Sequence, residues 1–172
     1  MNEIDVKKTE NLLEKLKKAK STQEMDTLLA TELNQHGSMA EIIGMPDSLL
    51  QNIEAEATRL YNEDSYDDAR IFYQFLATCR PGIQTYWMNL GATCMKLELY
   101  EDALKCYGLA TIVDPTDPRP YFFSAYSNRK IEKIAEAKLC LNQVIVLCKD
   151  SLEWQELKNQ ASNFHHQING KG

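Results

Sequence analysis

The sequence predicts an all-α solenoid of three helix pairs, with an N-terminal helical arm and a C-terminal capping helix. Three alanines, Ala69, Ala103 and Ala137, stand 34 residues apart, and large and small side chains follow the same order around each. A fixed period of this length indicates stacked copies of one supersecondary unit. The 172 residues are 44% hydrophobic with only seven glycines and five prolines, which suits one continuous helical core and leaves little room for a sheet.

Further landmarks keep this period and identify the unit as the tetratricopeptide repeat, a pair of helices called A and B. Helix A has a large residue one turn before a small one, and helix B begins with a bulky residue three positions before its alanine. The large residue of helix A is Ile53, Trp87 or Tyr121, and the small residue after it is Ala57, Gly91 or Ala125. The bulky residue of helix B is Tyr66, Tyr100 or Ile134. An ordinary helical bundle would match so many positions only by chance, so we set it aside.

The repeats divide the chain into three regions. These are an arm (1–47), three repeats (48–150, comprising about 50–83, 84–117 and 118–149) and a capping helix with a frayed tail (151–172). Apolar stripes in the arm predict helices at 8–20 and from about Thr22, and a short amphipathic run at 39–44. The apolar faces of the arm need a partner, which is either the first repeat or a second copy of the protein.

The residues after repeat three predict the helix that ends the solenoid. It starts at Asp150 or Ser151 and places Leu157, Ala161 and Phe164 roughly on one face, with polar residues elsewhere. A terminal unit of a solenoid has a side that no further repeat covers, and this helix would close that side.

Several classes of function are disfavoured. A net charge of −6 argues against nucleic acid, and the lysines of the first twenty residues alternate with acidic residues as on a solvated helix face. Phosphate loops, nucleophile elbows and paired His and Glu at metal spacing are missing, so we expect neither an enzyme nor a cofactor. No run of residues reaches the length of a membrane span, and no signal peptide is evident, so we expect a cytoplasmic protein.

Cysteines and histidines do not suggest a metal site. None of the five cysteines forms a close CxxC pair, and an odd count favours reduced thiols in a reducing compartment; they are Cys79, Cys94, Cys106, Cys140 and Cys148. His165 and His166 are adjacent, and His36 has no carboxylate partner at ligand spacing, so all three are interpreted as solvated side chains.

The repeat register also nominates a binding surface, because helix A lines the inner curve of such a superhelix. The candidate groove consists of Tyr61, Thr85, Met88, Asn89, Ala92, Met95, Arg119, Phe122, Tyr126 and Arg129. Its methionines and aromatics adapt to apolar side chains, while Asn89 and the arginines can hydrogen-bond a backbone, so an extended peptide is the predicted ligand. The alternative for the methionines and aromatics is that they belong to the core between repeats. Glu54 at the first repeat disfavours a carboxylate ligand there.

The arm and repeats resemble the class II chaperones of type III secretion systems, the LcrH/SycD type, over about residues 22–168. The segments that carry the resemblance are 37–43, 48–50, 66–69, 90–92, 100–104 and 117–122. The most particular of them is the acidic-Pro-Arg start of repeat three, which is followed by aromatic residues.

This resemblance implies a bacterial cytoplasmic chaperone that keeps hydrophobic translocator proteins soluble and unassembled before export. Members of the family hold an extended segment, often Pro-x-Leu-x-x-Pro, in the concave groove and often dimerise through the N-terminal helices. The implied partners are therefore translocators and a second copy, with no nucleic acid and no membrane insertion. Relatives tend to have apolar residues where this chain has Glu54 and Thr58. The contact between the first repeat and the peptide is therefore expected to be weaker or differently built in this chain. The alternative function is a scaffold that joins folded partners.

Overall fold

The computed structural model describes residues 37–149 and 151–169, with single positions at 14, 15, 18, 27, 28, 31 and 35. The described helices, in chain order, are α3 (Met39–Ile42), α4 (Asp47–Asn62), α5 (Tyr66–Cys79), α6 (Gln84–Lys96), α7 (Tyr100–Val113), α8 (Arg119–Lys130), α9 (Ile134–Leu147) and α10 (Gln155–Asn169). No strand occurs among these residues. The helices predicted at 8–20 and from Thr22 lie outside the described residues.

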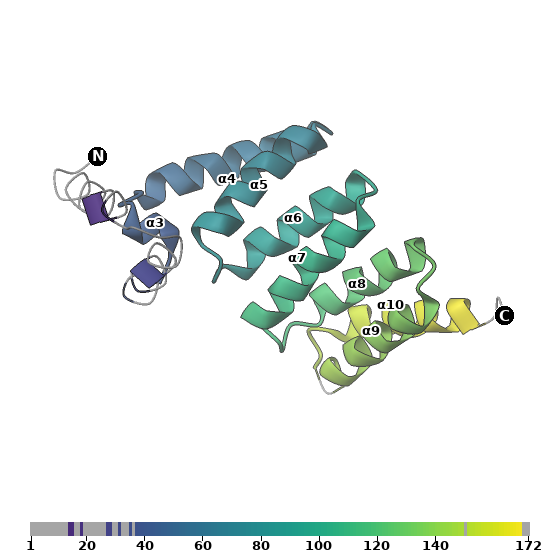
Figure 1. Ribbon diagram of the computed structural model, residues 1–172. Coiled ribbons are helices and arrows are strands. Elements are labelled where there is room, and N and C mark those ends of the chain that lie inside the picture. Colours follow the sequence, from purple (N-terminus) through teal and green to yellow (C-terminus); the bar gives the residue numbers. More distant parts are fainter. Residues whose placement is uncertain are drawn as a thin grey trace.

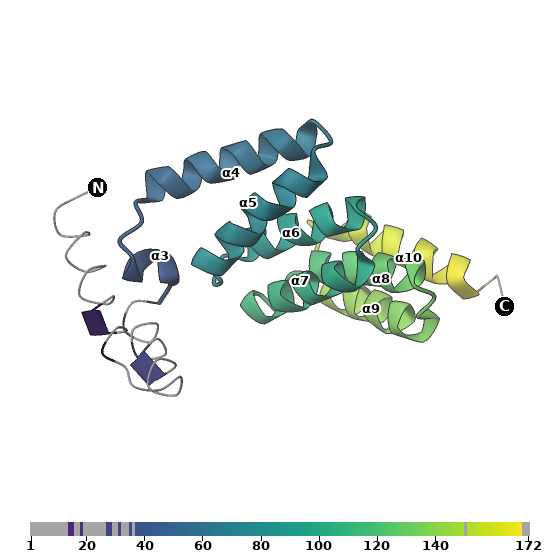
Figure 2. The same cartoon turned by 45° about the horizontal axis from the view of Figure 1, so that its top comes forward.

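The helices form a solenoid, and the predicted fold class is confirmed. Each helix from α5 to α10 packs against the one before it, and α3 packs against α5. Figure 1 shows three antiparallel pairs, α4 with α5, α6 with α7 and α8 with α9, stacked in one direction along the molecule. In Figure 2, α10 runs beside the last pair and covers the C-terminal end of the stack. None of the helices in the described ranges is long and apolar enough to cross a bilayer.

The turn between helices A and B has the same backbone in every repeat. Asp64, Glu98 and Glu132 have φ values of 60°, 60° and 63°, in the left-handed region, and they stand 34 residues apart. After each, the next N–H donates to a carbonyl five residues earlier at 2.9 Å; the pairs are Ser65 to Leu60, Leu99 to Cys94, and Lys133 to Asn128. This pattern is the Schellman motif, which satisfies carbonyls at a helix end. The 34-residue period therefore appears in the backbone conformation as well as in the pattern of side chains.

We expect Glu98→Gly to stabilise the protein by about 0.5–1 kcal/mol, because glycine adopts the left-handed conformation without steric cost from a Cβ atom. The midpoint of thermal unfolding, followed by circular dichroism, should rise by about 1–4 °C. Glu98→Ala is the matched control, since it removes the carboxylate but keeps the Cβ atom and should give no gain. An equal gain in both variants would contradict the backbone explanation.

The buried apolar residues form two clusters that meet within α8. The first spans α3 to α7 and centres on residues such as Leu76, Leu90 and Tyr107. The second joins α8, α9 and α10 around residues such as Leu141 and Val144. Phe123 packs against the first cluster, whereas its neighbour Phe122 packs against the second. Helix α8 therefore connects two cores.

The crossing point of helices A and B is tightest in the second repeat. Gly91 is buried there, and a Cβ atom built on it would lie 2.6 Å from Cε1 of Tyr107 and 2.8 Å from Cζ. Real Cβ atoms do not approach an aromatic ring so closely. Tyr107 is itself fully buried and stacks on Phe123, with ring centroids 5.6 Å apart. The absence of a side chain at residue 91 therefore lets α6 and α7 approach around this ring.

The capping helix begins later than the sequence predicts. The expected start was Asp150 or Ser151, but α10 begins at Gln155. The intervening turn places Trp154 beside α8, with its ring centroid 5.6 Å from the guanidinium carbon of Arg119. Trp154 also packs against the second core cluster. The turn therefore positions an aromatic contact before the helix starts.

Candidate peptide-binding groove

The candidate groove residues all lie on the A helices, as the repeat register predicts. Tyr61 lies on α4; Thr85, Met88, Asn89, Ala92 and Met95 lie on α6; Arg119, Phe122, Tyr126 and Arg129 lie on α8. None of the ten is fully buried, and Tyr126 is 42% exposed. All ten side chains therefore have some surface that another molecule could contact.

Four of these side chains also contribute to the core. Tyr61, Met88 and Met95 pack against the first cluster, and Phe122 packs against the second. Met95 is held further by Tyr107, whose hydroxyl donates to the Met95 sulfur at 3.0 Å. Burial raises the pKa of Tyr107 well above its usual range, so this donor keeps its proton. The core role predicted as the alternative is therefore observed for these four residues, and each is only half-buried, so the binding interpretation stays a prediction compatible with it.

In the third repeat the groove residues meet an aromatic side chain of the capping helix. Phe164 of α10 lies 6.5 Å from Phe122 and 6.3 Å from Tyr126, measured between ring centroids. Lys130 places its ammonium 5.6 Å from the centroid of Tyr126. The sequence assigned Phe164 only to the apolar face of a cap, because nothing in the repeat pattern shows where α10 lies. The aromatic surface therefore continues beyond the last repeat.

The first repeat presents polar groups that already have partners. Tyr86 of α6 donates its hydroxyl to Oε2 of Glu54 at 3.4 Å, and the Thr58 and Tyr73 hydroxyls lie 3.1 Å apart. Burial, and then the charge of Glu54, raises the pKa of Tyr86. These bonds link α4 to α6 and α5. Glu54 and Thr58, which the sequence marked as departures from the family, are therefore joined to the repeats around them.

Arg119 has a strong partner within the chain. Its Nε and Nη2 donate to Oδ1 and Oδ2 of Asp117 at 3.0 and 2.6 Å, and its backbone N–H donates to Oδ1 at 2.9 Å. The hydrogen bonds to Asp117, whose side chain is only 4% exposed, raise the pKa of Arg119. Its guanidinium also faces Trp154. The acidic-Pro-Arg sequence therefore ties the start of α8 to the turn before α10, a role that the sequence alone did not reveal.

We expect Asp117→Ala to lower the free energy of unfolding by about 1.5–3 kcal/mol, because a nearly buried carboxylate that accepts several hydrogen bonds is lost. Thermal melts followed by circular dichroism should show the loss, and the fluorescence of Trp154 should change in the folded state. Asp102→Ala is the control, since the exposed pair of Asp102 with Lys105 contributes little to stability. Equal melting temperatures for the two variants would contradict this role of Asp117.

Together, the fold and this surface define a tetratricopeptide-repeat protein with a mixed aromatic, methionine and arginine surface on its A helices. A family model described as "Tetratricopeptide repeat" matches residues 57–81. The chaperone protein SicA of Salmonella typhimurium is 26% identical over 112 residues, which cover 65% of this chain and 68% of SicA. The low calcium response locus protein H of Yersinia pestis is 25% identical over 143 residues, covering 83% of this chain and 85% of that protein.

A solved structure agrees with these relatives. The Yersinia enterocolitica type III secretion chaperone SycD, in complex with a peptide of the translocator YopD, matches with a TM-score of 0.69 and 25% identity. The match covers 73% of this chain and 95% of SycD. The chain is thus similar to the class II type III secretion chaperones of the LcrH/SycD type, and the resemblance inferred from its sequence is confirmed.

Proposed function

We propose that this protein is a bacterial cytoplasmic chaperone for the hydrophobic translocators of a type III secretion system, and not an enzyme. It holds an extended segment of the client in the candidate groove and keeps the client soluble and unassembled before export. The observation that carries the proposal is the row of partly exposed apolar side chains on successive A helices. Met88 on α6 and Phe122 and Tyr126 on α8 form this row, with Phe164 of α10 beyond them.

The relatives support the nature of the ligand. SycD has been solved with a peptide of the translocator YopD, and SicA is named a chaperone. A segment with prolines suits this groove, because proline holds an extended conformation and lowers the entropy lost on binding. Methionine and aromatic side chains accept leucine and proline rings of varied shape, while the side chain of Asn89 is free to bond a peptide group. The net charge of −6 would help to keep a complex with an aggregation-prone client in solution.

The regions of the chain have separate roles in this proposal. Residues 48–150 bind the client, and residues 151–172 cap the solenoid and add Phe164 to the binding surface. Residues 1–47 form the arm, which joins two copies into a homodimer. Light scattering on the full chain, and on a chain that starts at residue 37, tests this last role: a dimer that becomes a monomer on truncation supports it, and an unchanged mass contradicts it.

Binding of a synthetic peptide to the full chain tests the main proposal. A fluorescent peptide of about fifteen residues with one Pro-x-Leu-x-x-Pro motif should bind at least tenfold more tightly than the same peptide with the prolines and leucine replaced by serine, a difference of about 1.4 kcal/mol. Anisotropy titrations measure both affinities. Equal affinities, or no binding of either peptide, would overturn the proposed mode of client recognition.

A scaffold that joins folded partners is the second candidate, and one observation favours it. Several large apolar side chains are more than half exposed on the B helices, whereas the candidate groove residues lie on the A helices; they are Ile71, Ile112, Leu139 and Val146. If partners dock there, Ile112→Glu should reduce their capture while peptide binding in the groove stays unchanged. Loss of partner capture only on substitution in the groove would reject the scaffold.

A further inference from the structure

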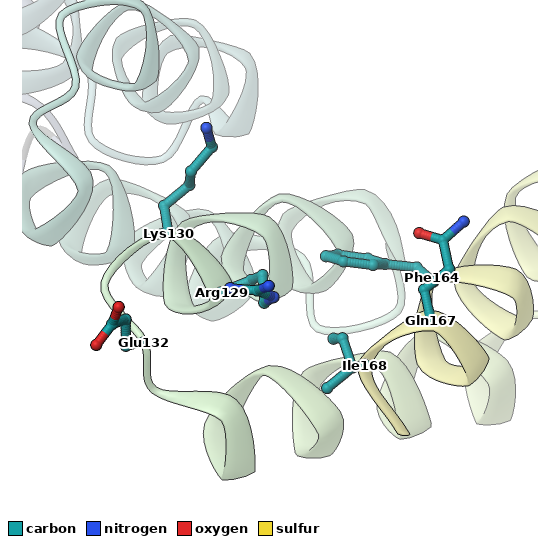
Figure 3. Close-up of a pocket in the computed structure, with 6 residues that line it drawn as sticks. All are labelled: Arg129, Lys130, Glu132, Phe164, Gln167 and Ile168. Carbon is teal, nitrogen blue, oxygen red and sulfur yellow. The ribbon is translucent and has the colours of Figure 1, made fainter. Parts of the chain in front are cut away.

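A cavity lies between the third repeat and the capping helix, at the end of α8 and beside α10. Its volume is about 420 Å³, and it is lined by Arg129, Lys130, Glu132, Phe164, Gln167 and Ile168. Figure 3 shows Arg129 at the end of α8, with Phe164 and Ile168 extending toward it from α10. Two of the lining residues belong to α8, one to the turn after it and three to α10. The cavity therefore exists only because α10 folds back beside α8.

Arg129 is half-buried at this cavity and has no carboxylate within ion-pair distance among the described residues. Three other arginines are paired: Arg59 with Glu56 and Glu63, Arg80 with Asp47, and Arg119 with Asp117. Arg70 has no ion pair among the described residues either, but it lies on α5, away from this cavity. Glu132 is the acidic residue of the lining, but Figure 3 shows its carboxylate on the far side of the α8–α9 turn, directed away from Arg129. The guanidinium of Arg129 therefore keeps its donors available to a ligand.

The apolar part of the cavity is continuous with the candidate groove. Phe164 lines the cavity and also contacts Phe122 and Tyr126, which belong to the groove. Ile168 forms a second apolar contact and is 8% exposed. A side chain of the client that enters from the groove would contact this aromatic surface before it reaches Arg129. Its carbon atoms would pack against Phe164, and its terminal group would need to accept hydrogen bonds from Arg129.

The chemistry of Arg129 selects that terminal group. A guanidinium binds carboxylates with two parallel, charge-assisted hydrogen bonds, and partial burial strengthens such a pair relative to one in bulk water. The overall charge of −6 repels acidic segments elsewhere on the surface, so attraction to an acid would be local to this site. In the proposed function the client lies in the groove as a segment within its chain, so the carboxylate that reaches Arg129 would belong to a side chain and not to a chain terminus.

We propose that this cavity is an end subsite of the groove, and that it takes an aspartate or glutamate side chain of the client segment next to its apolar anchors. The inference rests on the proposed function and adds a specificity to it. A client segment with an acidic residue at one flank of its proline motif would be preferred over the same segment with a neutral flank.

Three peptides with one common proline motif test the subsite on the full chain: one with glutamine flanks, one with two glutamates before the motif and one with two glutamates after it. We expect one acidic peptide to bind about tenfold more tightly than the neutral one at low salt, with the advantage shrinking at 0.5 M NaCl, where the Debye length is only about 4 Å. The other acidic peptide should gain nothing, because the subsite lies at one end of the groove.

Variants of Arg129 assign the effect to this residue. Arg129→Gln should remove the advantage of the acidic peptide over the neutral one, whereas the control Lys105→Gln, at an exposed residue of α7, should keep that advantage. Arg129→Glu should reverse the preference in favour of a peptide with lysines at the same flank. Circular dichroism melts would establish that each variant is folded.

The possible outcomes separate the two proposals. If the neutral peptide binds but no acidic flank improves affinity, or the improvement survives Arg129→Gln, the subsite is wrong while the chaperone function stands. If no peptide with the motif binds, the proposed function fails and the subsite fails with it.

Discussion

Gly91→Ala is expected to lower the free energy of unfolding by about 1–3 kcal/mol, because the added methyl group overlaps the ring of Tyr107. The ring has no free space to move into, since Tyr107 is fully buried and stacks on Phe123. The midpoint of thermal unfolding should fall by about 2–10 °C. This result would run against intrinsic helix propensity, on which alanine exceeds glycine by about 1 kcal/mol.

Two further variants test the steric explanation. Gly108→Ala places the same methyl group on α7, where nothing lies within 4 Å of the new Cβ atom, so it should stabilise the protein. The third repeat has Ala125 and Leu141 at positions equivalent to Gly91 and Tyr107. Tyr107→Leu should therefore relieve the clash, and the double variant should lose less stability than the sum of the single variants. Additive losses would contradict a direct contact between residues 91 and 107.

Met88→Glu combined with Tyr126→Glu should weaken binding of the proline-motif peptide at least 100-fold, or about 2.7 kcal/mol. Each substitution places a charge where an apolar side chain of the client would bury it without a partner. Tyr126 is preferred to Phe122 for this test because it is 42% exposed, whereas Phe122 packs against the second core cluster. Isothermal titration calorimetry on the full chain would give the affinities.

The matched control for the groove variant carries the same change in charge on the B helices. Ile112→Glu with Val146→Glu alters two residues that are 77% and 64% exposed, and it should leave peptide affinity within about twofold of the original. Helix content should be equal in both double variants. A comparable loss of affinity in the two would mean that net charge, and not the groove, controls binding.

The features predicted best from the sequence are those that repeat. Small residues at 57, 91 and 125 fix where helices A and B cross, and a crossing point requires a small side chain whatever surrounds it. The assignment of candidate groove residues to helices A follows from the same register. Whether a client occupies all ten positions stays a prediction, because the structure contains only this chain.

Contacts between distant parts of the chain could not be predicted. The bond from Arg119 to Asp117 joins near neighbours, but the stacking of Arg119 on Trp154 depends on a turn that breaks the expected capping helix. The position of Phe164 beside Tyr126 depends on how α10 lies against α8. The repeat pattern carries no information on the packing of these two helices, because α10 is not part of a repeat. The left-handed residues 64, 98 and 132 show no glycine or asparagine that would mark them, since they are Asp and Glu.

The division of the buried residues into two clusters has a consequence for cooperativity. The two clusters meet through the packing of α8 against α7, so opening of one half leaves the buried cluster of the other intact. A peptide that touches Met88 on one half and Tyr126 on the other would bind only when both are closed. The client would then stabilise the closed arrangement of both halves, and its departure at export would leave each half free to open without the other.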